Sequence, residues 1–157
     1  MFAVVTNCTA SKLKVAGPAR ELYTGPSVQR VVRVVDEARS RGIPATLYII
    51  SARYGLVHEN DIIEPYDETL SGKRPEEIKA WARRAGLHAA FQKIADVATV
   101  ILVVSKPYYI AVEDVACQSD IYVLAPYKAC GKWIKTGNFN KHLVLRKLLF
   151  SLWSKRG

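Results

Sequence analysis

The sequence predicts a single three-layer α/β domain over residues 1–157, with a mainly parallel sheet of four or more strands. Four short apolar runs have the length and residue types of buried strands: "MFAVVT", "ATLYIIS", "TVILVVS" and "DIYVLAP". Segments whose apolar residues recur at helical spacing separate these runs. Strands that alternate with helices imply parallel pairing through right-handed crossovers. The chain is long enough for one compact domain and too short for two ordinary ones.

Each helix is predicted from spacing and from its first residue. Pro26 suits the first turn of a helix that carries valines at helical spacing and stops at Gly42. Pro75 begins a long helix that runs to about residue 95, and Pro107 opens a shorter one. Residues 141–156 form an amphipathic C-terminal helix with a basic face. The polar segments 7–25 and 51–70 are expected to be loops.

Composition and motifs exclude several classes of protein. Half of the residues are hydrophobic and 24% are charged, which is typical of a soluble globular protein. No apolar run approaches the roughly 20 residues of a membrane span, and the N-terminus has no signal-peptide pattern. We therefore expect a cytoplasmic protein that does not bind a membrane. The GxxxxGK[ST] and GxGxxG patterns are absent. The sequence predicts no ATP or NAD site of those kinds and no cofactor.

The three cysteines give no sign of a disulfide or a metal site. Cys8, Cys117 and Cys130 form an odd set without CxxC spacing, so no disulfide framework is expected in a reducing cytosol. No close ligand pair anchors a zinc ion on Cys117, Cys130 and His142. We expect no metal.

Charge is distributed unevenly along the chain. The net charge is +9, and no acid follows Asp120, although eight Lys and Arg residues do. A basic end suggests a polyanionic partner, and the alternative is a solvated basic surface. The residues predicted to contact nucleic acid are Lys128, Lys132, Lys135 and Lys141.

The loop after the first strand carries the strongest candidate for chemistry. In an open α/β sheet, ligands bind beyond the carboxyl ends of the strands. Here this loop holds Cys8, Ser11 and Lys12, followed by Arg20 and Tyr23. A lysine in this position can neutralise phosphate or, as a neutral amine, act as nucleophile or base. The alternative is an ordinary exposed loop lysine.

The loop after the second strand mixes acids, aromatic residues and turn formers in the stretch "SARYGLVHENDIIEPYDETL". Aromatic rings and a carboxylate suit recognition of a nucleobase, because the ring stacks and the carboxylate accepts from exocyclic N–H groups. We expect Glu64 and Tyr66 to face a pocket. The alternative is a packed loop whose acids bind Arg20 or Arg53. The candidate residues of this loop are Ser51, Tyr54, Gly55, Asp61, Glu64, Tyr66 and Thr69.

Four blocks of residues 4–70 resemble the signature of a widespread family of small prokaryotic proteins of unknown function: "NCTASK", "GPARELYTG", "IISARYGLV" and "DIIEPYDETL". More distantly, they are similar to YaaA-type peroxide-stress proteins and to the lysine-bearing domain of archaeosine synthase, a tRNA-modifying enzyme. The resemblance implies an α/β fold and a nucleic-acid or nucleobase ligand. It favours one pocket formed by Lys12, Arg20, Ser51, Tyr54, Glu64 and Tyr66.

These observations lead to a first hypothesis, an enzyme of glycosylase, transglycosylase or base-modifying type that acts on a nucleobase in DNA or RNA. Lys12 would be the nucleophile or the electrostatic stabiliser, and Glu64 or Asp61 the general base or the reader of the base edge. Tyr54 or Tyr66 would stack, and Arg20 would hold phosphate or orient Glu64. The alternatives are a non-catalytic nucleic-acid-binding module and a small-molecule nucleotide sensor.

Overall fold

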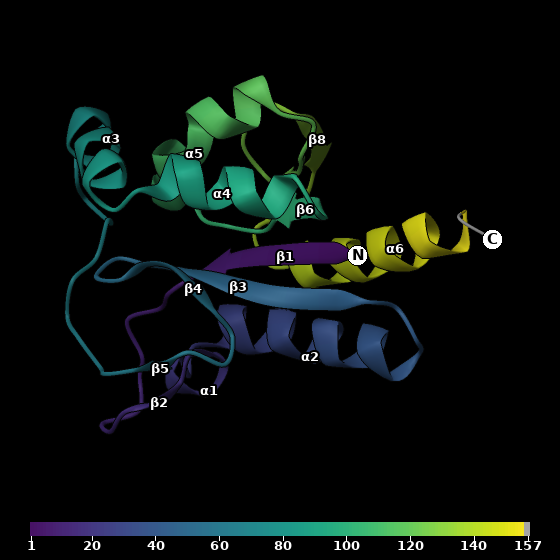
Figure 1. Cartoon of the computed structure of the whole chain (residues 1–157), viewed down its shortest axis with the longest axis horizontal. Helices are drawn as coiled ribbons and strands as arrows, with labels where there is room; N and C mark the ends of the chain where they lie inside the picture. The colour runs from purple at the N-terminus through teal and green to yellow at the C-terminus, as the bar shows by residue number, and fades with distance from the viewer. Residues whose placement is uncertain (156–157) are drawn as a thin grey trace.

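The computed structural model describes residues 1–155, in which a six-stranded sheet lies between two layers of helices (Figure 1). The strand order is β4-β3-β1-β6-β7-β8, and every pair is parallel except β3–β4. The predicted mainly parallel α/β fold is confirmed. The strands are β1 (Phe2–Asn7), β3 (Ala45–Ser51), β4 (Gly55–His58), β6 (Thr99–Leu102), β7 (Tyr122–Ala125) and β8 (Lys132–Lys135), with a separate two-residue pair β2 (Gly17–Pro18) and β5 (Ile62–Ile63).

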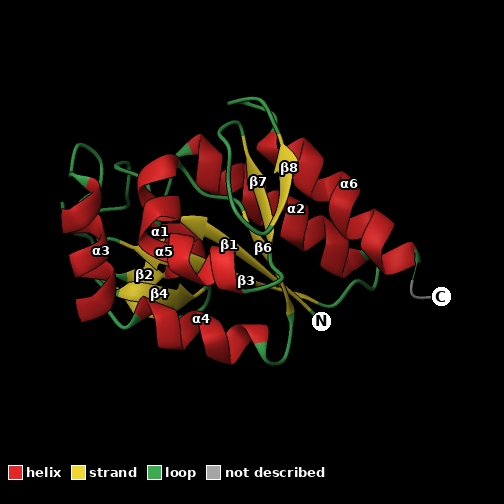
Figure 2. Cartoon of the chain, turned by 90° about the horizontal axis from the view of Figure 1, so that it is seen from above, coloured by secondary structure: helices red, strands yellow, loops and turns green. Residues whose placement is uncertain are grey.

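Helices cover both faces of the sheet (Figures 1 and 2). One layer contains α1 (Ala19–Leu22), α2 (Pro26–Ser40) and α6 (Lys141–Ser154). In the other layer α4 (Leu87–Ala95) packs on the sheet, and α5 (Lys106–Gln118) and α3 (Pro75–Arg84) pack against α4 and against each other. Among residues 1–155, no helix combines the length and the apolar character needed to cross a membrane.

Strand β1 occupies the centre of the sheet. It pairs with β3 from Phe2 opposite Ala45 onward, and with β6 from Phe2 opposite Thr99 onward. The chain leaves β1 toward one side of the sheet and later returns to build the other side. The carboxyl ends of β1 and β6 therefore form the switch point at which open α/β sheets bind ligands.

Three secondary-structure predictions were wrong in detail. The predicted loop 7–25 contains the two-residue strand β2 and the short helix α1. The long helix predicted from Pro75 is divided into α3 and α4, because Gly86 adopts a left-handed conformation with φ of 67°. Part of the predicted loop 51–70 is strand β4, which returns alongside β3 from a turn at Gly55, where φ is 78°. Strand β8 was not predicted, because its four residues are not buried.

The expectation that no disulfide forms was also wrong. Cys117 and Cys130 are joined by a disulfide, with their Cα atoms 4.8 Å apart. Strand β8 runs parallel to β7, so the chain must return to the start of β7 before β8 begins. That return brings Cys130 beside the end of α5, where Cys117 lies. The topology places the two thiols together, and the sequence spacing does not reveal it.

Glu59 connects several elements through a buried carboxylate that is 1% exposed. It accepts hydrogen bonds from Arg20 Nη1 at 2.9 Å, from Arg39 at 2.7 and 2.9 Å, and from the Leu47 N–H at 2.9 Å. These bonds join the segment after β4 to α1, α2 and β3. Burial alone would raise the pKa of Glu59, but the hydrogen bonds from Arg39 and Leu47 hold that pKa below its ordinary value.

We predict that Glu59→Gln lowers the free energy of unfolding at pH 7 by about 3 kcal/mol, because two arginines lose a buried partner. The lowered pKa means that this contribution is complete above about pH 4.5 and is lost as the pH falls through the folded-state pKa. Urea unfolding between pH 7 and pH 3 measures both effects. The control is Glu76→Gln, which removes an exposed carboxylate on α3. A Glu59→Gln protein as stable as the control would contradict this role.

Candidate functional site

A pocket of about 540 Å³ opens beyond the carboxyl end of β1. We call it the Lys12 pocket. Residues 7–12 form one wall, residues 67–71 form another, and the start of α5 closes it. Its lining includes Cys8, Thr9, Lys12, Asp67, Glu68, Thr69 and Tyr108. Loops that follow different strands therefore meet in one pocket, as the topology of the sheet predicts.

Backbone contacts with residues 22–24 hold Lys12 in place. Lys12 forms an isolated β-bridge with Tyr23, and the Leu13 N–H donates to the Leu22 carbonyl at 2.9 Å. The ammonium lies 4.5 Å from the ring centroid of Tyr66 and 5.8 Å from that of Tyr23. Among residues 1–155 Lys12 forms no ion pair. Its positive charge is therefore held by aromatic faces and is not neutralised by a carboxylate.

A buried hydroxyl network lies beneath Lys12. The Tyr66 hydroxyl contacts the Tyr23 hydroxyl at 2.6 Å and accepts from the Ser51 hydroxyl at 2.7 Å. The Ser51 oxygen in turn accepts from the Tyr54 N–H at 2.9 Å. Burial raises the pKa of Tyr23 to about 12 and also raises that of Tyr66. Both phenols stay protonated at neutral pH, so the network serves as a rigid floor and supplies no base.

Cys8 belongs to the inner wall of the pocket. Its sulfur lies 3.1 Å from the Tyr108 hydroxyl, and both side chains are buried. Burial, followed by the neighbouring Cys8, raises the pKa of Tyr108. The Tyr108 hydroxyl also accepts a hydrogen bond from the Leu70 N–H at 3.5 Å. These contacts attach the start of α5 to the loops that carry Lys12 and Thr69.

The structure brings most of the predicted site residues into one region. Cys8, Lys12 and Thr69 line the pocket, while Tyr23, Ser51 and Tyr66 form its floor. Tyr54 does not line the pocket, and its ring packs 5.6 Å from that of Tyr66. Gly55 forms the turn into β4 with a positive φ. A Cβ atom at this position would lie 3.4 Å from the carbonyl oxygen of Ala85. Ser11 is exposed, and its backbone carbonyl accepts a hydrogen bond from the Thr9 hydroxyl at 3.0 Å.

Glu64, Asp61 and Arg20 do not join the predicted pocket. Glu64 is exposed, although Ile63 and Tyr66 on either side of it in the sequence are buried. The Asp61 carboxylate accepts from the His58 N–H at 2.9 Å. Arg20 is bound to Glu59 and Asp36. The carboxylates that line the pocket are Asp67 and Glu68, neither of which is among the candidate residues predicted from the sequence.

The four lysines predicted to contact nucleic acid differ in exposure and in their contacts. Lys128 and Lys135 are exposed, and Lys132 forms an ion pair with Asp120 at 3.1 Å. Lys141 is half-buried, and its ammonium donates to the Val104 carbonyl at 3.3 Å. Burial lowers the pKa of Lys141. Within residues 1–155, no group of three His, Cys, Asp or Glu side chains could hold a metal ion.

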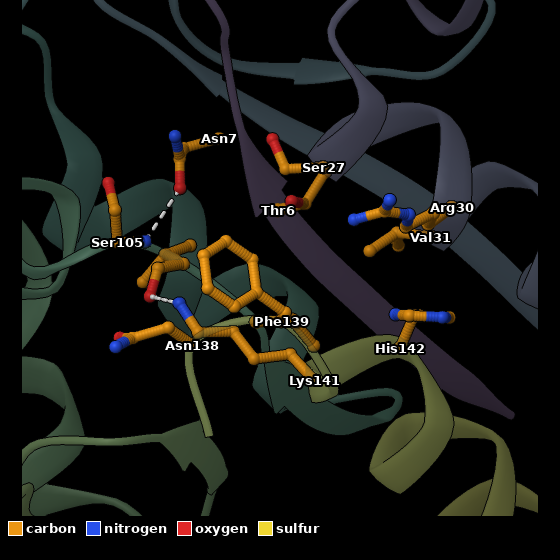
Figure 3. Close-up of a pocket in the computed structure, with 12 residues that line it drawn as sticks. Thr6, Asn7, Ser27, Arg30, Val31, Ser105, Asn138, Phe139, Lys141 and His142 are labelled. Carbon is orange, nitrogen blue, oxygen red and sulfur yellow. Dashed lines mark hydrogen bonds between the residues drawn. The ribbon is translucent and has the colours of Figure 1, made fainter. Parts of the chain in front are cut away.

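A second cavity, of about 100 Å³, lies at the switch point itself (Figure 3). We call it the switch-point cavity. It shares Asn7, Ser27 and Ser105 with the Lys12 pocket, so the two are neighbouring parts of one crevice. The Asn7 side chain joins the two central loops by accepting the Ser105 N–H at 2.8 Å. Of the residues around this cavity, the sequence predicted a binding role for Lys141 alone. The position of the cavity agrees with the rule that open α/β sheets bind ligands where the strand order reverses.

The fold and the crevice together define an open α/β protein with a ligand-binding geometry at the switch point of its sheet. The chain belongs to a family of unknown function (DUF6884), whose model matches residues 3–135. Comparisons with curated proteins and with solved structures find no match. Both walls of the Lys12 pocket lie within the matched region.

We predict that the free energy of unfolding falls as the pH rises from about 10 to about 12, because Tyr23 ionises more easily in the unfolded chain. The raised pKa means that this contribution is complete below pH 10 and is lost as the pH rises through the folded value. Tyr23→Phe should reduce the slope of the free energy of unfolding against pH, as measured by urea unfolding at each pH. The matched control is Tyr48→Phe, on the edge of the core. Equal slopes in both variants would show that Tyr23 is not buried in the network.

Proposed function

We propose that the Lys12 pocket binds a nucleotide, either free or within nucleic acid, and that the protein acts on its base. The observation that carries this proposal is the shared pocket: the Lys12 ammonium, which has no ion pair, and the carboxylates of Asp67 and Glu68 line the same open space from two walls. A nucleobase edge offers both acceptors and exocyclic N–H donors, which match a cation and carboxylates respectively.

The aromatic residues beside the pocket support the same ligand class. Tyr54 is 39% exposed, and its ring packs edge-on against Tyr66, which lies under Lys12. An exposed ring next to hydrogen-bonding groups suits stacking with a base. The resemblance of the sequence blocks to YaaA-type proteins and to the lysine-bearing domain of archaeosine synthase also favours a nucleobase. Base modification, hydrolysis and transglycosylation are the reaction types that this resemblance supports.

The surroundings of Lys12 favour an electrostatic role over a covalent one. As a nucleophile, Nζ would bond to C1′ of the sugar while the glycosidic bond breaks, and the departing base would take up a proton. That step needs a neutral amine. The aromatic faces of Tyr66 and Tyr23 stabilise the ammonium instead. We therefore assign Lys12 to stabilising negative charge on the nucleotide or on the departing base, with Asp67 or Glu68 as the nearby acid–base group.

We predict that Lys12→Met weakens nucleotide binding at least tenfold, whereas Lys12→Arg retains most of it, because only the charge is required. Binding of the four nucleoside monophosphates and of short DNA and RNA strands is measured by calorimetry. Release or modification of the base is followed by mass spectrometry. Lys93→Met, on the exposed side of α4, is the control.

The outcomes separate the competing functions. Loss of base release in Lys12→Arg, together with borohydride trapping at Lys12, would replace the electrostatic role with covalent catalysis. Binding without any change in the base would assign a non-catalytic module. Binding of mononucleotides without binding of strands would assign a sensor. Binding by Lys12→Met equal to that of Lys93→Met would exclude the proposal.

We also propose that the basic C-terminal part of the chain contacts the phosphate backbone of a nucleic acid. Lys128 and Lys135 are exposed with no carboxylate partner among residues 1–155, and the region after Asp120 contains no acid. Lys132 would have to leave Asp120 to make such a contact. Exposed lysines that neutralise phosphates release counterions, so the affinity falls with salt concentration.

Replacing Lys128, Lys132 and Lys135 together by Gln is predicted to reduce the slope of log K against log salt by up to about 3 units. Fluorescence anisotropy with a labelled strand at four salt concentrations measures this slope. A charge-matched control replaces three exposed residues: Lys73 in the loop before α3, Arg84 on α3 and Lys93 on α4. If the two triple variants have the same slope, the basic end is a solvated surface.

A further inference from the structure

Three helices begin at the switch-point cavity. Ser27 lies in the first turn of α2, Ser105 is the N-cap of α5, and Lys141 and His142 open α6 (Figure 3). None of the three helices has a side-chain cap. The first backbone hydrogen bond within α2 is donated by the Gln29 N–H, and the first within α5 by the Tyr108 N–H. The backbone N–H groups that precede these residues in each first turn have no partner within the helix. Three positive dipole ends at one cavity favour an anion.

A buried hydroxyl without a partner provides independent support. Thr6 is 4% exposed and lines the cavity, yet its side chain makes no hydrogen bond within residues 1–155. Within the same residues, every side-chain polar atom that is sealed from solvent has a partner. The Thr6 hydroxyl therefore opens onto the cavity. Burying an unpaired hydroxyl costs free energy, so a buried hydroxyl that faces a cavity points to a ligand that completes its hydrogen bonds.

The charges around the cavity have one sign. Arg30 and Lys141 line it, and the lining contains no carboxylate. His142 also lines the cavity, but burial, followed by Arg30 and Arg33, lowers its pKa, so it is a neutral polar group at pH 7. Within residues 1–155 neither Arg30 nor His142 forms an ion pair, and Lys141 donates only to a backbone carbonyl. In Figure 3 Arg30 and His142 lie on one side, and Lys141 approaches from another. An unpaired guanidinium is well suited to two oxygens of a tetrahedral anion.

We infer that the switch-point cavity binds a phosphate group. The volume of about 100 Å³ exceeds what a single water molecule needs and fits a small oxyanion. Donors approach from three helix ends, from Thr6 and Ser27, and from Arg30, so they surround the cavity on several sides. A tetrahedral group with several charged oxygens uses such an arrangement more fully than a planar carboxylate does.

The position of the cavity relates it to the Lys12 pocket. Asn7, Ser27 and Ser105 belong to both, so one ligand can place its phosphate at the switch point and its organic part beside Lys12. Assigning the phosphate to a nucleotide rests on the function proposed above. The phosphate site itself does not, because it is derived from the cavity alone.

The test is a calorimetric titration of the full chain with inorganic phosphate at constant ionic strength, supported by ³¹P line broadening. We expect saturable binding with a Kd below about 10 mM. Thr6→Val retains the shape of the buried side chain and should weaken phosphate binding about tenfold. Arg30→Gln should weaken it at least as much. Lys147→Gln makes the same charge change on the exposed side of α6 and should have no effect. Thermal unfolding verifies that each variant is folded.

Two further titrations define the source of the phosphate. One outcome is that nucleoside monophosphates bind more tightly than inorganic phosphate and lose this advantage in Lys12→Met. That outcome would show that one nucleotide occupies both the switch-point cavity and the Lys12 pocket. Phosphate binding that Lys12→Met leaves unchanged, with no advantage for nucleotides, supports the phosphate site and refutes the nucleotide. The inference would be overturned if sulfate bound as tightly as phosphate. It would also be overturned if the Thr6→Val and Arg30→Gln proteins bound phosphate like the unaltered chain.

Discussion

The parallel pairing of β1 with both β3 and β6 is the constraint on which the rest of the structure depends. It places the carboxyl ends of three strands at one edge of the sheet. The loops after those ends then meet, and the helices that follow the loops begin there. Asn7, at the end of β1, reinforces this arrangement by accepting the Ser105 N–H. Both the Lys12 pocket and the switch-point cavity result from this single topological feature.

The unusual composition of the segment after β3 has two separate causes. Glu59 and Tyr66 are buried polar groups whose hydrogen bonds are satisfied, by Arg20 and Arg39 in one case and by Ser51 and Tyr23 in the other. These residues hold the loops in position. Asp67 and Glu68 are exposed and line the pocket, and the one ion pair between them and the rest of residues 1–155 joins Glu68 to Arg53 at 3.9 Å. The buried structural acid and the acids that line the pocket are therefore near one another in the sequence and have different surroundings in the fold.

The two parts of the crevice differ in character, which favours a ligand with two unlike ends. The switch-point cavity is small, cationic and formed by helix N-termini, while the Lys12 pocket is larger and carries both signs of charge. Satisfied hydroxyls beneath Lys12 contrast with the unpaired hydroxyl of Thr6. A rigid floor beside unpaired donors is the arrangement expected of a preorganised site, since little reordering accompanies binding.

The sequence by itself determined the α/β class, the four buried strands and most helix starts, because hydrophobic periodicity and the positions of proline are local signals. It also identified Lys12, Ser51 and Tyr66 as neighbours. Only the tertiary structure decided that Arg20 binds Glu59, that Glu64 faces outward, and that Cys117 meets Cys130. The same holds for Thr6 and Arg30 at the switch point. Each of these outcomes depends on which distant segments lie side by side, and strand order and register set that, whereas local residue patterns do not.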